Sequence, residues 1–271
     1  MKDLLDAAPR ALREALREGS YRGPTAGLAR GYAQANMVVI PRKLLESFLV
    51  FCARNPIPCP VIDVTDPGDP EPRASAPGAD LRRDLGRYNV YRDGKLDEVV
   101  SDLDELWDEE MVGVLLGCSY TFERALEDAG VPLRHVEAER VVPMYITDVP
   151  TREAGPFGGA VVVSMRPVPA HLVSRATTVS ARYAFAHGAP LHAGDPRSIG
   201  IDDIMSPDYG EPPVMRGGDV PIFWACGVTS QRALLAAAPP LAMAHVPGHM
   251  FVTDLLDEDL TTGIPVLGDG P

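Results

Sequence analysis

The sequence predicts a mixed α/β fold in which two similar, closely packed halves form a single domain over residues 1–271. Apolar runs typical of strands alternate with amphipathic segments typical of helices along the chain. Several short segments also recur in the same order, in pseudo-repeats at approximately 21–150 and 151–260. The 27 prolines and 25 glycines impose many turns. We therefore expect short elements in an irregular fold, and neither a Rossmann fold nor a TIM barrel.

The first half begins with an amphipathic helix predicted over residues 9–19, opened by a proline and stopped by a glycine. A glycine-rich turn, an apolar strand over 37–40 and a second helix opened by Pro41 follow. A short strand is predicted over 61–64. The Asp93-Gly94 pair predicts a hairpin between its flanking runs, and Ser101 is predicted to cap a helix over 102–107.

The remaining elements repeat one pattern, in which an apolar strand ends in a turn and a helix begins. Strands are predicted over 112–118, 159–165 and 220–226, and helices over 121–130, 169–183 and 229–238. The two segments CSYTFERAL and CGVTSQRAL, which start at Cys118 and Cys226, are identical at five of nine positions. A His-Val pair follows each of them, at His135 and His245. The later segments MYITD and MFVTD also match, so the sequence predicts an internal duplication with a cleft between equivalent strand ends.

The charge balance of the chain limits the classes of molecule that it can bind. With 25 basic and 38 acidic residues the net charge is -13, which disfavours nucleic acid and anionic membranes. The expected partner is a small acidic metabolite held in a local cationic pocket. No apolar run approaches the roughly 20 residues that span a bilayer, and the N-terminus lacks the apolar core of a signal peptide. We expect a cytoplasmic protein with reduced cysteines, and a homodimer as the default assembly.

The two Cys-turn-helix units are candidate anion sites. Unpaired N–H groups at the start of a helix bind carboxylates, and the same field lowers a thiol's pKa. Cys118 and Cys226 are therefore candidate catalytic residues. The hydroxyls of Ser119, Thr121 and Thr229 are candidate substrate ligands. The alternative is that the thiols are small buried hydrophobes and the hydroxyls ordinary helix caps.

Two further segments carry candidate residues. In the Pro-Gly turn near the end of the chain, Gly248 allows close approach of the backbone to a ligand, and His249 is a candidate acid or base that titrates near neutrality. Asp80 and Arg82 form a candidate clamp for an amino acid, with Asp80 also a candidate base. The alternatives are a structural histidine and a helix start with surface ion pairs.

Two polar residues beside apolar strands complete the substrate-binding candidates. Arg166 ends the apolar strand GAVVVSM, and a charge at the end of a buried strand usually faces a cleft or a partner. Asn36 lies at the end of the glycine-rich segment, just before an apolar strand.

A metal site would have to come from Cys118, Cys226, His245 and His249. Zinc accepts such ligands, but only the two histidines have a close ligand spacing. The P-loop, GxGxxG, HExxH and GxSxG motifs are missing from the sequence. We expect neither a metal nor an organic cofactor.

Ten blocks of the sequence resemble the D-glutamate cyclase-like family of hydro-lyases. They run from about Tyr21 to Asp254 and include GCSYTFERAL, VVVSMRPV, VPIFWACGVTSQ and HVPGHMFVTD. One departure is LARG at 28–31, where many relatives have Ala-Pro-Gly. The resemblance implies a carbon–oxygen lyase that acts on a small acidic metabolite, and for characterised relatives the conversion of D-glutamate to 5-oxo-D-proline and water.

That reaction would assign roles to the candidates. His249 or Asp80 would take the ammonium proton, Arg166 or Arg82 would hold the α-carboxylate, and the helix starts after Cys118 and Cys226 would stabilise the oxyanion. Three alternatives stay open. The chain could be a hydro-lyase for another hydroxy or amino acid, a cysteine-dependent amidase or hydrolase, or a non-catalytic metabolite-binding protein.

Overall fold

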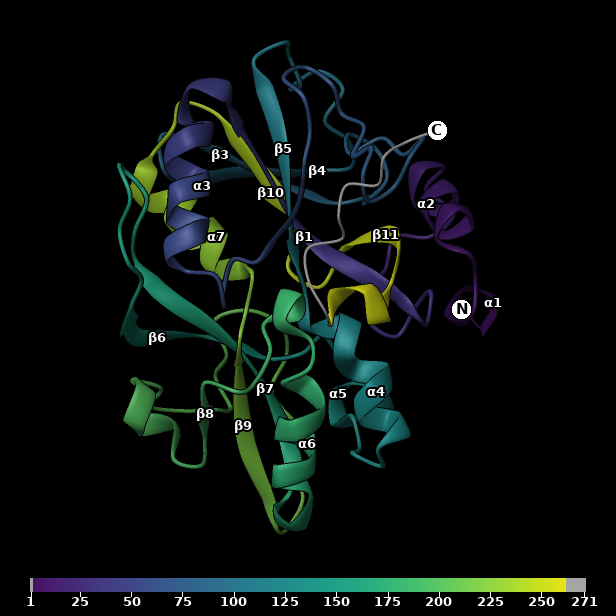
Figure 1. Cartoon of the computed structure of the whole chain (residues 1–271), viewed down its shortest axis with the longest axis vertical. Coiled ribbons are helices and arrows are strands. Elements are labelled where there is room, and N and C mark those ends of the chain that lie inside the picture. The colour runs from purple at the N-terminus through teal and green to yellow at the C-terminus, as the bar shows by residue number, and fades with distance from the viewer. Residues whose placement is uncertain (1, 262–271) are drawn as a thin grey trace.

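A computed structural model describes residues 2–261, and the side chains from Leu4 onward. It confirms the mixed α/β class: two antiparallel sheets lie one above the other, with helices against both (Figure 1). The predicted single domain also includes Met1 and 262–271, which lie outside the described residues. No helix in the described part is long and apolar enough to cross a membrane.

The larger sheet has seven strands in the order β2-β5-β1-β10-β3-β4, with β11 paired to the other end of β1. Its strands are β1 (Tyr32–Pro41), β2 (Val61–Val64), β3 (Tyr88–Arg92), β4 (Lys95–Val100), β5 (Met111–Gly117), β10 (Ala242–His245) and β11 (Phe251–Leu256). The predicted hairpin is confirmed: β3 pairs with β4 across a turn in which Asp93 and Gly94 both have positive φ.

The smaller sheet has four strands in the order β6-β7-β9-β8. They are β6 (Met144–Pro150), β7 (Ala160–Pro169), β8 (His192–Ala193) and β9 (Asp219–Ala225). The α-helices are α1 (Lys2–Leu5), α2 (Pro9–Arg17), α3 (Leu45–Arg54), α4 (Glu123–Asp128), α5 (Arg134–Glu137), α6 (Val173–Ser180) and α7 (Val228–Ala237). Short 3-10 turns are η1 (Arg42–Leu44), η2 (Ser119–Phe122), η3 (Ala170–Leu172), η4 (Ala184–Ala186), η5 (Pro196–Ile199) and η6 (Asp257–Leu260).

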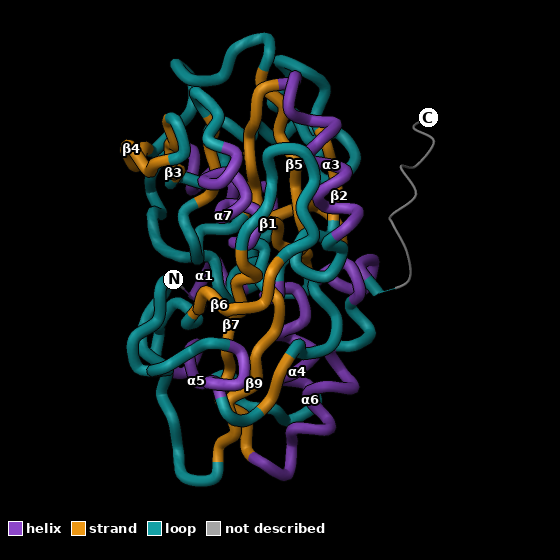
Figure 2. The backbone as a smooth tube through the Cα atoms, turned by 90° about the vertical axis from the view of Figure 1, so that its left-hand side faces the viewer, coloured by secondary structure: helices purple, strands orange, loops and turns teal. Residues whose placement is uncertain are grey.

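The helices that follow β5 and β9 each pack beside the other sheet. Helix α7 follows β9 of the smaller sheet, yet its Ala233 and Leu234 lie in one apolar cluster with Phe48 and Phe51 of α3. Helix α4 follows β5 of the larger sheet and packs against α6. Figure 2 shows α3 and α7 near the upper strands and α4 and α6 near the lower ones. The chain therefore crosses twice between the two layers.

The strand registers of the two sheets agree position by position. Ala35 of β1 pairs with Gly117, and Val163 of β7 pairs with Ala225, in each case the residue before a cysteine. The same two residues pair with Phe251 of β11 and Tyr145 of β6. The matching segments MYITD and MFVTD thus pair with equivalent strands, each in the opposite half. Equal registers are what the predicted duplication would produce, and the duplication itself stays a prediction.

Three expected elements differ from those observed. The segment 102–107 forms turns instead of a helix: the Trp107 amide donates to the Leu103 carbonyl four residues back, but no second bond of this kind continues the turn within the segment. Strand β1 starts at Tyr32, earlier than predicted, because its polar residues pair with β11 and β5. Strand β7 continues to Pro169, so Arg166 lies inside the strand and not at its end.

Candidate functional site

Arg166 anchors a buried polar network between the two sheets. Its side chain is 1% exposed, and it shares a strand face with Ser164 because side chains two apart point the same way. Nε and Nη2 donate to Oε1 of Glu123 at 2.9 and 2.5 Å, Nη2 also donates to Ser119 Oγ at 3.0 Å, and Nη1 donates to Ser164 Oγ at 3.2 Å. These contacts use four of the five N–H groups of a guanidinium.

Aromatic rings cover the same guanidinium. Its central carbon lies 5.4 Å from the ring centroid of Phe122 and 5.5 Å from that of Trp224. Contacts of this kind stabilise a cation that has been removed from water. Arg166 is therefore fixed in position by its ion pair, its hydroxyl contacts and its ring contacts together.

Glu123 is the acidic centre of the network. It is the first residue of α4 and is only 4% exposed. Its Oε1 atom lies 2.9 Å from Nε2 of His135, a residue of α5 that is also buried. Burial raises the pKa of the Glu123 carboxyl, but the charges of His135 and Arg166 outweigh it, so the pKa is lowered overall. Glu123 is consequently ionised at neutral pH.

Several buried polar atoms in this region lack a hydrogen-bond partner among the described residues. They include Glu123 Oε2, Tyr120 Oη, Gln34 Oε1 and both ring nitrogens of His135, since the 2.9 Å approach of Nε2 to Glu123 lacks hydrogen-bond geometry. Tyr120 and His135 stack with ring centroids 6.4 Å apart, so four of these atoms belong to one contact group. Buried polar groups are normally satisfied, and an orphaned set marks a place where a ligand or water completes the bonding.

A pocket opens directly onto this group. The cavity itself is small, about 30 Å³, and the space around it including the open solvent at its mouth is about 400 Å³. Gln34, Tyr120 and Glu123 line it beside the cations Arg30 and Arg124. The mouth of the pocket therefore carries positive charge, and three of the residues that hold orphaned polar atoms, Gln34, Tyr120 and Glu123, form part of its lining.

The two predicted cysteine sites lie together next to this network. Cys118 and Cys226 share one apolar cluster with Tyr120 and Met144. Burial raises the pKa of both thiols, that of Cys226 to about 11 and that of Cys118 further. The lowering expected from the helix starts is therefore outweighed, and both thiols are protonated at neutral pH.

The remaining strand-end candidates are held by the backbone. Asn36 Nδ2 donates to the Gly117 carbonyl at 2.7 Å, beside Cys118, and its amide group lies where a side chain on Gly227 would stand. Thr121 Oγ1 accepts the Gln34 amide at 3.1 Å, and Thr229 Oγ1 accepts the Val162 amide at 2.9 Å. Ser119 is the one hydroxyl candidate that contacts Arg166.

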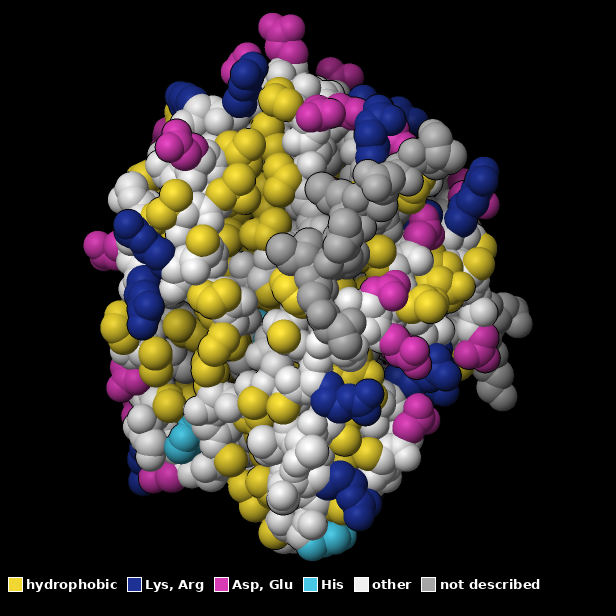
Figure 3. Space-filling view, in the orientation of Figure 1, with side chains coloured by type: hydrophobic (Ala, Val, Ile, Leu, Met, Phe, Trp, Pro, Cys, Tyr) yellow, Lys and Arg dark blue, Asp and Glu magenta, His cyan; other side chains and the backbone are white. Residues whose placement is uncertain are grey.

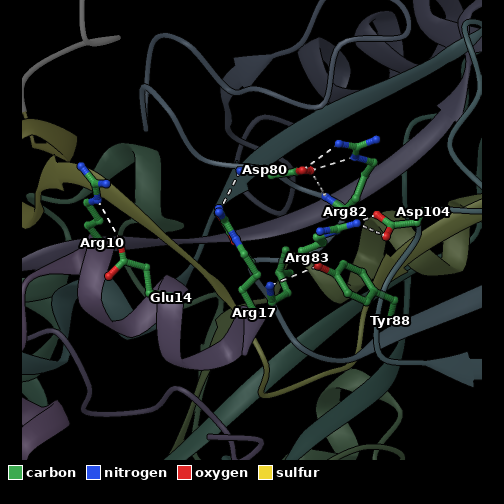
Figure 4. Close-up of polar contacts among 10 residues, drawn as sticks. Arg10, Glu14, Arg17, Asp80, Arg82, Arg83, Tyr88 and Asp104 are labelled. Atoms are coloured by element: carbon green, nitrogen blue, oxygen red, sulfur yellow. Dashed lines mark hydrogen bonds and ion pairs between the residues drawn. The ribbon is translucent and has the colours of Figure 1, made fainter. Parts of the chain in front are cut away.

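Asp80 and Arg82 lie apart from the network. They pair with each other at 2.8 Å in a half-exposed loop, near Arg17 and Asp104, as Figure 4 shows. Such surface pairs typically contribute less than about 1 kcal/mol. No hydrogen bond or ion pair in the described part of the chain joins them to Arg166 or Glu123.

His249 is buried in a separate turn. Its backbone amide donates to the Val246 carbonyl, and Gly248 with φ +90° accepts from Thr25. Burial lowers the pKa of His249 to about 4, with a smaller contribution from Arg87. Contrary to the sequence expectation, it does not titrate near neutrality. Within residues 2–261, no group of three or more His, Cys, Asp or Glu side chains is arranged to hold a metal ion.

The residues that sequence reasoning missed are Glu123, His135 and Tyr120. The repeat contained the signal: Glu123 aligns with Gln231, and His135 with His245. In the structure Gln231 Nε2 contacts the carbonyl of His245 at 2.9 Å, so both halves join these positions. Only the first half has a charged residue, Glu123, at the first of these positions. This difference from Gln231 is the sequence signal that could have identified Glu123 as a candidate.

The comparisons with known proteins agree with the resemblance in the sequence. Residues 112–254 match the family model of D-glutamate cyclase. A Stutzerimonas stutzeri protein named "Putative hydro-lyase" is 55% identical over 94% of this chain and 96% of its own. A Geobacillus kaustophilus protein with the same description is 54% identical over 94% and 98%.

Among solved structures, a nitrogen repressor-like protein from Methanococcus jannaschii has a TM-score of 0.38 and 12% identity, covering 90% of this chain and 96% of that one. The aligned regions of the two bacterial relatives extend over nearly the whole chain. The chain belongs to the D-glutamate cyclase family and is a lyase of the hydro-lyase class.

Proposed function

We propose that this protein converts D-glutamate into 5-oxo-D-proline and water in the pocket lined by Gln34, Tyr120 and Glu123. The observation that carries the proposal is Glu123 itself, a buried carboxylate at the pocket with one oxygen held by Arg166 and His135 and the other unpartnered. The match to the D-glutamate cyclase model supports the choice of substrate.

The reaction forms one C–N bond and breaks one C–O bond. The substrate nitrogen attacks the side-chain carboxyl carbon, and a tetrahedral intermediate carries the negative charge on oxygen. The two hydrogens that the nitrogen loses leave with one carboxyl oxygen as water. Since no proton is gained or lost overall, the enzyme needs a relay that moves protons from nitrogen to oxygen.

Glu123 Oε2 has the properties of such a relay. It accepts each of the two protons in turn from the nitrogen and delivers it to the departing oxygen. Each delivery leaves the carboxylate ionised, the form that His135 and Arg166 favour. Tyr120 Oη, a buried donor without a partner, would stabilise the charge on the tetrahedral oxygen. Closing the ring is intramolecular, so a pocket that folds the substrate back on itself supplies much of the rate.

The test is to incubate the purified protein separately with D-glutamate, L-glutamate and 5-oxo-D-proline, and to follow interconversion by chiral chromatography. The proposal expects interconversion of the two D-compounds and none of L-glutamate above the uncatalysed rate. The Asp80→Asn variant, which alters the surface pair, should retain this activity. Absence of turnover in both directions, with folded protein shown by circular dichroism, would contradict the proposal.

A further inference from the structure

The mouth of the pocket brings together a cation and a carboxylate from distant parts of the chain. Arg124 lies in α4 and Asp257 begins η6, and both line the pocket. The two converge on Gly31. The Asp257 amide donates to the Gly31 carbonyl at 3.0 Å, and a Cβ added to Gly31 would lie 2.5 Å from Nη1 of Arg124. Gly31, with φ +90°, thus leaves the space that the guanidinium uses.

Neither side chain is committed to a strong partner. Arg124 has only one ion-pair contact among the described residues, at 3.8 Å to Asp128, and it is half-exposed. The other charges at the pocket are already paired, Arg30 with Glu127 at 2.9 Å and Glu123 with Arg166. Asp257 is 7% exposed, and its side chain makes no ion pair within residues 2–261. Burial raises the pKa of its carboxyl, and the nearby charge of Arg124 and a hydrogen bond from the Glu258 backbone offset part of that rise.

We infer that Arg124 and Asp257 form a clamp for the α-amino acid end of the substrate, with Arg124 on its carboxylate and Asp257 on its ammonium. A guanidinium matches a carboxylate in geometry and charge, and a buried carboxylate that has no cation within ion-pair distance in the described part of the chain can accept an ammonium group. Gln34 and Tyr120, whose Oε1 and Oη atoms are orphaned, line the same pocket and are a second sign that a polar ligand belongs there.

The clamp rests on the proposed function and deepens it, because it separates two substrate classes. A 2-hydroxy acid offers the carboxylate to Arg124 but no cation to Asp257. The pocket should therefore select 2-amino acids over 2-hydroxy acids. The preference arises because the uncharged hydroxyl of a 2-hydroxy acid would leave the buried Asp257 carboxylate without an ionic partner.

The test measures binding and not turnover. The probes are D-norvaline and (R)-2-hydroxypentanoate, which match glutamate in chain length but have no second carboxylate to close a ring. By calorimetry at pH 7.5, wild-type protein should bind D-norvaline at least ten times more tightly than the hydroxy acid. Asp257→Asn should remove this preference, and Arg124→Gln should weaken binding of both probes at least ten-fold. Asp97→Asn, an exposed acid on β4 that pairs with Arg92 and does not line the pocket, should change neither.

Equal affinity of wild-type protein for the two probes, or no binding of either, would overturn the clamp. An Asp257→Asn variant that keeps the preference would also overturn it. These results are distinguishable from failure of the proposed function. Predicted binding without turnover of D-glutamate refutes the reaction and leaves the clamp, whereas turnover unaffected by Arg124→Gln and Asp257→Asn refutes the clamp and leaves the reaction.

Discussion

Nε2 of His135 lies 2.9 Å from Oε1 of Glu123, with both side chains buried between the two sheets. In the second half the corresponding residues are Gln231 and His245, an uncharged pair that also bonds to Tyr91. The two halves share strand registers but differ in charge at this point. Arg166 occurs where the first half has Val38, as the pairing of both strands with their neighbours indicates. The charged residues Glu123 and Arg166 therefore have uncharged residues, Gln231 and Val38, at the equivalent positions.

The buried ion pair makes Arg166 important for stability as well as for the site. Replacing it with methionine leaves Glu123 charged and buried, so Arg166→Met should lower the free energy of unfolding by about 3–5 kcal/mol. Urea denaturation at pH 7.5 measures the change. Arg83→Met, which removes an exposed pair with Asp104, should cost less than about 1 kcal/mol. Similar losses for the two variants would contradict the description of the network.

Three buried histidines predict that acid destabilises the fold. Burial lowers the pKa of His187, His245 and His249 to about 4 in each case. An unfolded chain protonates its histidines near pH 6.5, so the unfolded state binds more protons between these values. Stability is therefore full above about pH 6.5 and falls as the pH drops toward about 4, by up to about 1.4 kcal/mol per pH unit for each histidine.

Urea midpoints at pH 7.5, 6.5, 5.5 and 4.5 measure this dependence. The variant His249→Gln should reduce the slope by about one proton, since it removes one of the three groups. A midpoint that does not change between pH 6.5 and 5 would show that these imidazoles are not held neutral by burial.

Most strands could be predicted from the sequence, because apolar runs such as VGVLLG and AVVVSM are buried on both faces and are recognisable locally. The helix predicted over 102–107 is wrong. The pattern of acids and leucines in this segment is typical of a helix, but tertiary contacts bury Leu103 and Trp107 in a turn. Arg166 was recognised as a candidate from its apolar surroundings. Its partner Glu123 comes from another element, as does His135 beside Glu123, and no local pattern joins Arg166 to a residue 43 positions away.

Burial of the thiols predicts that neither is a nucleophile. The pKa of Cys226 is raised to about 11 and that of Cys118 further, chiefly by burial, so little thiolate is present at pH 7.5. Cys118→Ala and Cys226→Ala should each form 5-oxo-D-proline within about ten-fold of the wild-type rate, and native protein should react slowly with iodoacetamide. Loss of turnover in a folded Cys118→Ala variant would favour the cysteine-dependent alternative.

The most direct test of the account is the rate of lactam formation by Glu123→Gln, compared with Glu127→Gln. The change leaves Arg166 buried without its ion partner and should therefore lower stability, so melting curves of both variants establish that each is folded at the assay temperature. Glu127 lies on the same helix and pairs with Arg30 at the pocket mouth. If Glu123 relays the protons, Glu123→Gln should lower kcat by at least about 100-fold, and Glu127→Gln should stay within a few-fold of wild type. A folded Glu123→Gln variant with wild-type kcat would contradict the central claim.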